Sequence, residues 1–361
     1  TPVDEARGQK WRIAMIKEGR FGIQEAVWLI TITISAKEFF ASSATVAAIV
    51  GTAGWYMTII SATAALVGFL IIHALLKCFP GKDLVEIFNL SLGRLVGFAF
   101  SGVLAVYLLF TAITRLSEFN EITRIYVFPL SSNSYIIGLF VISVCTLSYL
   151  GLESMARLAR LFAPPMVLGF FFVLALGIQN YRINNLYPLL GYGLEKTIST
   201  GIIRSSAYGE IIILAIFSEA FQGLKYIKRE GLIGLGLSAF VISMSLLAFT
   251  LTFPYYTARE FTAPMYELAG LIDFGRVLQR VESIFLFLWN LSTLISTTVV
   301  FYGFVRIFCK MFRIPDKGPV ILGGGIILYA GSLMHRDITS TILGGVELIR
   351  RLGSVVFFVL P

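Results

Sequence analysis

Long stretches of hydrophobic residues, separated by short polar segments, make up most of the sequence. Several stretches reach about 20 residues, the length that a helix needs to cross a hydrocarbon core about 30 Å thick. Because lipid offers the backbone no hydrogen-bonding partners, we expect each stretch to be helical. The sequence therefore predicts an all-α polytopic membrane protein of about ten spans. The first nine lie near residues 23–49, 54–76, 97–119, 135–151, 161–179, 199–222, 231–253, 283–305 and 319–334, and a tenth begins near 340 and is expected to be truncated.

Composition and charge support this interpretation. Hydrophobic residues make up 57% of the 361 residues and charged residues only 14%, whereas a soluble domain carries about 25% charged residues. The net charge of +8 does not indicate a nucleic-acid partner, because the basic residues gather in alternate short loops, as topology signals do. The N-terminal arm, residues 1–22, is rich in basic residues, so we expect a cytoplasmic N-terminus.

Other chemical signals are weak. Three cysteines and two histidines are widely spaced, so we expect neither a disulfide framework nor a metal site. The glycine clusters 231–236 and 323–325 lie in apolar stretches, where close packing of helices is a better explanation than a phosphate-binding loop. No nucleotide-binding or hydrolase motif occurs, and we expect no enzyme activity and no cofactor.

The first span contains a cation and an anion, Lys37 and Glu38. Lys37 lies 14 residues after Ile23, or about 21 Å along an α-helix, far from the cytoplasmic end of the span. An ionisable group inside a span costs about 2.5–3.5 kcal/mol on insertion scales and indicates a functional site. Adjacent residues do not share a helix face, so both side chains reach one groove only if the helix breaks. We take Ser35, Lys37 and Glu38 as candidate ligand-binding residues. Alternatively, the helix ends near Ser35 and the charged pair lies at the membrane interface, which leaves too few residues to cross.

A second polar island interrupts the sixth span, in the sequence RSSAYGEIIIL from Arg204 to Leu214. Glycine weakens a helix by about 1 kcal/mol relative to alanine, and Glu210 adds another acid inside a span. We predict a second break here, with Ser206, Tyr208, Gly209 and Glu210 as further ligand-binding candidates. The alternative is a helix that simply begins at Tyr208.

The third span ends with four charged residues at helical spacing. Arg115 and Glu118 are three residues apart, as are Glu121 and Arg124, and this spacing allows pairing on one helix. We interpret the outer pair as a solvated rim. The inner pair is a candidate for gating or lining a polar path, and we include Glu121 in that group.

The two predicted breaks lie five spans apart. An odd offset inverts the second half relative to the first, which gives a first five-helix repeat at 23–179 and a second at 180–361. Interrupted spans at corresponding positions of two halves indicate a binding site near the membrane midplane. Half-helix N-termini there attract a carboxylate, while acids and carbonyls attract a cation or amine. The pattern therefore predicts a small zwitterionic or polar ligand.

Four segments, in this order and with this topology, resemble a known family. They are FPGKDLVEIFNLSLGRLVG (79–97), NLYPLLGYGLEKTI (185–198), YGEIIIL (208–214) and APMYELAGLIDFGRVLQRVESIFLFLW (263–289). The chain is similar over nearly its whole length to the B-subunit permeases of spore germinant receptors, within the amino acid–polyamine–organocation transporter superfamily.

The resemblance implies a ten-helix fold of two inverted five-helix repeats, with the first and sixth helices discontinuous. It also implies a role in sensing nutrient germinants such as amino acids in the inner membrane of a spore. Its partners would be the receptor's membrane-embedded A subunit and its C subunit, a lipoprotein. By position, Gly209 and Glu210 match the family's Gly-Glu, and Glu118 and Glu121 match acids at the end of the third span. Arg280 and Glu282 match its Gln-Arg-x-Glu, so both join the candidate polar-path residues.

The first span departs from the family pattern. Many relatives have a break with glycine and threonine where this chain has Ala36-Lys37-Glu38. Lys37 and Glu38 either set the class of ligand or lock the site by internal pairing, and the sequence favours neither. Two functions follow: a germinant-binding receptor subunit, or an autonomous amino acid transporter coupled to protons through Glu210 or Glu38. An ion or water path through the bundle is a third interpretation.

Overall fold

The computed structural model describes residues 21–39, 42–272, 281–334 and 341–358. Within these ranges it is helical with connecting turns and contains no β-strand. The longer helices are α2 (Ile23–Ser35), α4 (Gly54–Cys78), α6 (Gly93–Tyr126), α7 (Asn133–Leu150), α8 (Leu152–Leu176), α11 (Leu224–Thr252), α14 (Val281–Phe312) and α15 (Gly318–Met334). The shorter ones are α3 (Ser42–Val50), α5 (Leu84–Ser91), α9 (Leu194–Ile203), α10 (Ile213–Ile216), α12 (Tyr255–Ala258), α13 (Pro264–Gly270) and α17 (Glu347–Phe358).

Tighter or wider turns connect several of these helices. The 3-10 segments are η1 (Ala36–Phe39), η2 (Gly51–Ala53), η3 (Gly177–Asn180), η4 (Ile183–Leu186), η5 (Arg204–Ile212) and η6 (Ser218–Ala220), and η7 (Thr341–Val346) is a π-helix. Such segments often mark functional positions when they interrupt an α-helix. Two of them, η1 and η5, fall where the sequence predicts the helix breaks.

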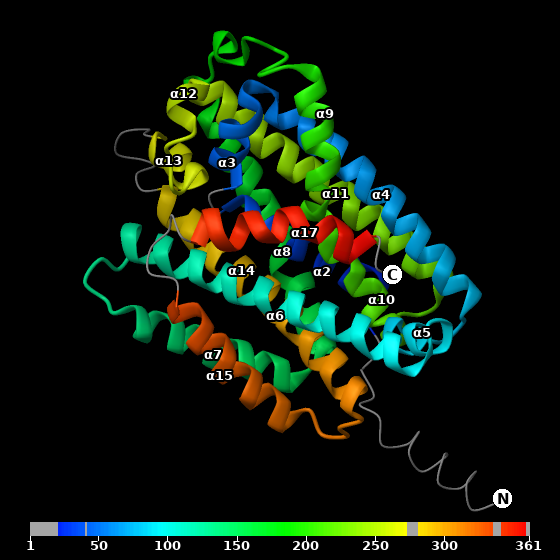
Figure 1. Ribbon diagram of the computed structural model, residues 1–361. Helices are drawn as coiled ribbons and strands as arrows, with labels where there is room; N and C mark the ends of the chain where they lie inside the picture. Colours follow the sequence, from blue (N-terminus) through cyan, green and yellow to red (C-terminus); the bar gives the residue numbers. More distant parts are fainter. Residues whose placement is uncertain (1–20, 40–41, 273–280, 335–340, 359–361) are drawn as a thin grey trace, which may run out of the picture.

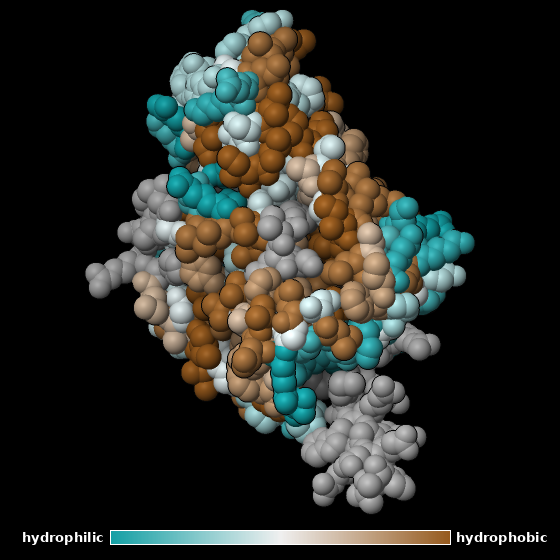
Figure 2. Space-filling model, turned by 45° about the vertical axis from the view of Figure 1, so that its right-hand side comes forward, coloured by the Kyte–Doolittle hydropathy of each residue, from teal (hydrophilic) through white to brown (hydrophobic). Residues whose placement is uncertain are grey.

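The molecule presents an apolar outer surface. Six helical segments among the described residues are long and apolar enough to cross a membrane, and α2 and α15 are shorter apolar helices. Large hydrophobic side chains project outward from several of them, including Val106, Ile142, Leu168 and Ile326. Figure 2 shows the resulting broad hydrophobic surface, with hydrophilic residues gathered toward its ends. A hydrophobic outer surface of this kind is suited to contact with lipid, and it confirms a polytopic membrane protein.

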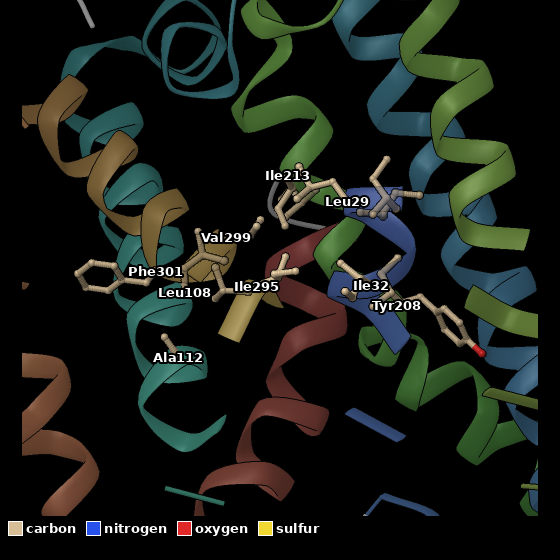
Figure 3. Packing of buried hydrophobic residues seen from close by; sticks show 14 of the residues in the cluster. Leu29, Ile32, Leu108, Ala112, Tyr208, Ile213, Ile295, Val299 and Phe301 are labelled. Carbon is tan, nitrogen blue, oxygen red and sulfur yellow. The ribbon is translucent and has the colours of Figure 1, made fainter. Parts of the chain in front are cut away.

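The helices that matter for the site lie in the interior of the bundle. Of the most apolar 18-residue stretch in each helix, 83% is buried in α14 and 28% in α7. Helix α14 is therefore central and α7 peripheral. Helix α2 packs against α8, α11 and α14, and α14 also packs along α6. Figure 3 shows side chains from these elements in the shared core, such as Ile32 of α2, Leu108 of α6, Tyr208 of η5 and Val299 of α14. The two breaks are therefore surrounded by protein and not by lipid.

Several glycines of the two clusters serve close packing, as predicted, whereas Gly236 and Gly323 have open space at their Cβ positions. Gly231 lies directly against the ring of Phe69, and a Cβ atom on Gly234 would come within 2.8 Å of Ile30 Cγ2. Glycine at such positions lets two helix backbones approach closely.

Several predicted boundaries were wrong. Helices α6, α11 and α14 extend beyond their predicted spans. The largest difference is at the fifth span, which we expected to begin at residue 161, whereas α8 begins at Leu152. Its first turns are amphipathic, since Arg157 pairs with Glu153 on the same helix and Arg160 pairs with Glu25 of α2. A search for long hydrophobic stretches leaves out these charged first turns, although they belong to the same helix.

Candidate functional site

The first span breaks where the sequence places Lys37. Helix α2 ends at Ser35, η1 follows, and α3 begins at Ser42. At the end of α2, the Ser35 hydroxyl donates to the carbonyl oxygen of Thr31 at 2.7 Å, a type of bond that competes with the helical backbone and bends helices. The change of direction carries Lys37 inward, and its exposed fraction is only 4%. Lys37 is thus buried in the protein and does not lie at an interface.

The sixth span breaks in the matching place. Helix α9 ends at Ile203, η5 follows as a 3-10 segment, and the short α10 completes the span. Runs of 3-10 helix longer than three or four residues are uncommon, because their hydrogen-bond geometry is poor. An α-helix does not begin at Tyr208, so this alternative is wrong. Almost all of η5 is buried, and it packs against α2, α4 and α17.

The two breaks are joined by an ion cluster centred on Glu210. Lys37 Nζ lies 2.9 Å from Glu210 Oε1 and 2.7 Å from Oε2, and it also donates to the carbonyl oxygen of Ala207. Arg115 Nη2 of α6 lies 2.8 Å from Glu210 Oε1. The exposed fractions are 4% for Lys37, 4% for Glu210 and 7% for Arg115. We refer to these three residues as the ion triad.

A second contact ties the ion triad to the central helix. Arg115 Nη1 donates to the hydroxyl of Ser296 on α14, and that hydroxyl donates to the carbonyl oxygen of Thr33 on α2 at 3.0 Å. A single guanidinium therefore contacts α14 and η5 directly and α2 through one hydroxyl. Movement of either broken span would change the partners of Arg115.

The ion triad is unbalanced, because one carboxylate faces two cations. Buried charges are tolerated when they are paired and hydrogen-bonded, and removing one partner of such a pair typically costs about 3–5 kcal/mol. Here the Glu210 carboxylate is the acceptor that both cations share. Lys37 is therefore paired internally, with Glu210, in this conformation. Internal pairing is one of the two roles expected for it.

A small cavity borders the ion triad. Its volume is about 20 Å³, and a water molecule needs about 10–15 Å³, so in this conformation it holds roughly one water. Its lining is polar and charged, and consists of Lys37, Ser42, Thr45, Glu118, Arg204, Ile342, Val346 and Arg350. An amino acid does not fit unless the surrounding helices separate. This conformation is therefore closed.

Helix α17 covers η5 and contributes part of this lining. Figure 1 shows α17 crossing the middle of the bundle, in red, in front of α2 and α8. Ser354 Oγ accepts a hydrogen bond from the backbone N–H of Ser206 at 3.1 Å and donates to the carbonyl oxygen of Ile203 at 2.6 Å. Arg204 of η5 forms an ion pair with Glu347 of α17. Polar contacts thus close the unwound backbone of η5 against α17.

The predicted ligand-binding residues lie in and around this cluster. Lys37 and Glu210 are in direct contact, the Ser206 hydroxyl donates to the carbonyl oxygen of Arg350 at 2.9 Å, and Tyr208 is fully buried. Gly209 lies against α17. The Glu38 side chain lies outside the described residues.

The predicted polar-path residues divide into groups. Arg115 belongs to the ion triad, and Glu118 lines the cavity. The pair of Glu121 and Arg124 forms at 2.9 Å, but Glu121 is buried, so it is not a solvated rim. Arg280 and the side chain of Glu282 lie outside the described residues.

Sequence reasoning missed the contribution of the last helix. Three residues of α17 contact or line the site: Glu347, Arg350 and Ser354. Arg204 of η5 and Ser296 of α14 were also missed. A signal was present, since α17 carries Glu347, Arg350 and Arg351 in a segment expected to be apolar. Three charges in 12 residues indicate a helix face that meets polar groups.

Comparison with known proteins places this geometry in context. Residues 23–340 match a family described as spore germination protein. Spore germination protein YndE of Bacillus subtilis (strain 168) is 22% identical over 318 residues, which covers 85% of this chain and 85% of that protein. Spore germination protein A2 of the same organism is 22% identical over 283 residues and 76% of each chain.

Solved structures of transporters share the fold. The crystal structure of MhsT in complex with L-phenylalanine matches with a TM-score of 0.65 and 15% identity, over 95% of this chain and 88% of that one. A substrate-bound, outward-open Na+-coupled sialic acid symporter matches with a TM-score of 0.62 and 11% identity, over 92% and 78% of the two chains. At these identities the likeness shows the fold alone, and it is the fold of membrane transporters.

Proposed function

Because the chain belongs to the spore germination protein family, we propose that it is the membrane subunit of a nutrient-germinant receptor and binds a small, amino-acid-like germinant at the break between the first and sixth spans. The observation that carries this proposal is the ion triad. It places Lys37, Glu210 and Arg115 between two unwound segments at the centre of the bundle. Ionisable groups at this depth mark a ligand or ion site by default.

The proposed signal is a change in conformational population. The cavity beside the ion triad holds about one water in the closed state. A ligand therefore requires α17, α3 or η5 to separate, and it stabilises the separated state by its differential affinity. In a receptor, that shift would act on an A subunit and a lipoprotein C subunit. The proposed location is the inner membrane of the spore, with residues 1–22 in the cytoplasm.

Ligand binding to the purified full chain in detergent tests this proposal. The proteinogenic L-amino acids are screened by the shift that each produces in the thermal unfolding midpoint. We expect at least one to stabilise the wild type, and expect Lys37→Ala and Glu210→Gln to abolish that shift. Lys196→Ala is the control, because the Lys196 side chain is exposed and lies over the ring of Tyr192. Normal binding by both triad variants would show that the site lies elsewhere.

A second candidate is an autonomous amino acid transporter coupled to protons. The observation that favours it is the fold, which this chain shares with a transporter bound to L-phenylalanine and with a Na+-coupled symporter. Uptake into proteoliposomes separates the two functions. Substrate accumulation that depends on a pH gradient would support the transporter, and ligand binding without uptake would support the receptor subunit.

A further inference from the structure

Arg350 of α17 carries a charge that no acid among the described residues balances in an ion pair. Its Nη1 donates to the carbonyl oxygen of Ser206 at 3.4 Å, which is a long hydrogen bond. The neighbouring arginines behave differently. Arg351 Nε lies 2.9 Å from Glu347 Oε1, and Arg204 forms an ion pair with the other oxygen of the same carboxylate. Glu347 is thus already shared by two arginines, and Arg350 has no carboxylate partner among the described residues.

Arg350 lines the cavity beside the ion triad together with Lys37 and Arg204. Among the described side chains around the cavity and the triad, cations outnumber acids. The cations are Lys37, Arg115, Arg204 and Arg350, and the acids are Glu118, Glu210 and Glu347.

The ion triad disfavours a ligand that binds mainly through an amine. An ammonium group has three donors, and that of Lys37 already contacts both oxygens of Glu210 and the carbonyl oxygen of Ala207. Arg115 takes up a further lone pair of the same carboxylate. A ligand ammonium would have to share this carboxylate with both cations and would add a cation where, among the described side chains, cations already outnumber acids.

A carboxylate fits the same surroundings. It brings a negative charge that the described side chains lack, and a guanidinium binds it through two parallel N–H donors, which an ammonium does not offer. The hydroxyl groups of Ser42 and Thr45 also line the cavity and are able to donate to carboxylate oxygens. Apart from Glu118, the polar groups that line the cavity therefore complement an anion.

We propose that Arg350 binds the carboxylate of the ligand, and that the protein recognises the ligand as an anion, with no requirement for a ligand amine. This inference rests on the proposed function, since it assigns the chemical class to the ligand of that same site. Because the closed cavity holds about one water, the carboxylate reaches Arg350 only when the helices around the cavity separate. The ligand then replaces the contacts between Arg350 and Ser206.

The test uses matched ligands on the full chain in detergent, with affinity measured by calorimetry. The amino acid that stabilises the wild type most is compared with its C-terminal amide and with the α-hydroxy acid that has the same side chain. We expect the hydroxy acid to bind within about threefold of the amino acid. We expect the amide to bind at least about tenfold more weakly, the size of effect that a lost charge-assisted hydrogen bond produces.

Two adjacent arginines supply the matched variants. Arg350→Gln is expected to weaken the amino acid and the hydroxy acid by about tenfold or more, while the amide is unchanged. Arg351→Gln, which alters an exposed residue paired with Glu347, is expected to change none of them. Arg350→Lys keeps the charge but loses the planar guanidinium. Its affinity for the amino acid should fall between those of Arg350→Gln and the wild type. This intermediate affinity separates a role in binding from a role in folding.

The outcomes distinguish this inference from the proposed function. If the amide binds as tightly as the acid, or if Arg350→Gln and Arg351→Gln behave alike, a ligand site exists but Arg350 does not bind a carboxylate. If none of the proteinogenic amino acids or their hydroxy acids binds the wild type, the proposed function fails together with the inference.

Discussion

Gly209 of η5 lies directly against the ring of Phe357 of α17, so closely that a Cβ atom on Gly209 would overlap ring carbons. The Phe357 ring is 2% exposed and meets the ring of Tyr107 edge-on, with centroids 4.9 Å apart. The ring is therefore held from two sides in this closed conformation. Gly209 is one of the positions at which α17 closely approaches the broken sixth span.

We expect Gly209→Ala to destabilise the protein by about 1–3 kcal/mol, the usual cost of overpacking a filled interior. Thermal unfolding of the purified chain measures the change. Gly236→Ala is the control, because nothing lies within 4 Å of its Cβ position, and alanine there should be neutral or slightly stabilising. Adding Phe357→Leu to Gly209→Ala should recover part of the loss. No recovery would mean that the cost lies in the backbone of η5 and not in this contact.

The ion triad predicts an unequal effect of its two charge deletions. Glu210→Gln leaves two buried cations without their shared carboxylate and should destabilise the protein by about 3–5 kcal/mol. Lys37→Met leaves Arg115 and Glu210 as a balanced pair, so it should cost clearly less. Chemical denaturation of both variants provides the comparison. Equal losses would mean that the carboxylate is balanced mainly by Lys37 and not by Arg115.

A second ion cluster holds one end of the bundle together. Lys310 of α14 pairs with Asp83 before α5 and with Glu219 of η6 at 3.0 Å, and Arg306 pairs with Glu219 at 2.7 Å. Burial raises the pKa of Asp83 above its usual range. Lys310→Met leaves that buried acid without its cation and should destabilise the protein by about 3 kcal/mol or more.

The control for this cluster is Lys77→Met, since Lys77 is exposed and its removal should change stability by less than about 0.5 kcal/mol. Thermal unfolding of the two variants under the same conditions measures the difference. A similar, small effect of both substitutions would show that water screens the Lys310 cluster.

Glu230 of α11 is a buried acid with no partner among the described residues. Its exposed fraction is 1%, its Oε2 makes no hydrogen bond, and it lies next to the tightly packed Gly231. A buried polar group without a partner costs about 1–3 kcal/mol in proteins, so Glu230→Met should stabilise the fold by a comparable amount. Glu153→Met, at a surface pair with Arg157, should have little effect. A stabilised Glu230→Met protein that no longer responds to ligand would mean that the carboxyl is kept for function.

The sequence by itself determined the architecture and the positions of the two breaks. The reason is that lipid allows a spanning backbone few alternatives to the helix, so hydrophobic length predicts spans, and a cluster of polar residues inside a span predicts an interruption. Lys37 and Glu210 were predicted to lie at these breaks for this reason. The pairing of Glu121 with Arg124, although not its burial, was predicted correctly because the spacing lies within one helix.

Only the tertiary structure decided which charges meet. Glu210 lies 95 residues from Arg115 and 173 from Lys37 along the chain, and helical periodicity carries no information about partners on other helices. The position of α17 could not be predicted from the sequence either. The packing of α17 across η5 brings Arg350 to the cavity and Phe357 to Gly209. An ion pair or a close contact depends on distances of a few ångströms, and the packing of the whole bundle sets those distances.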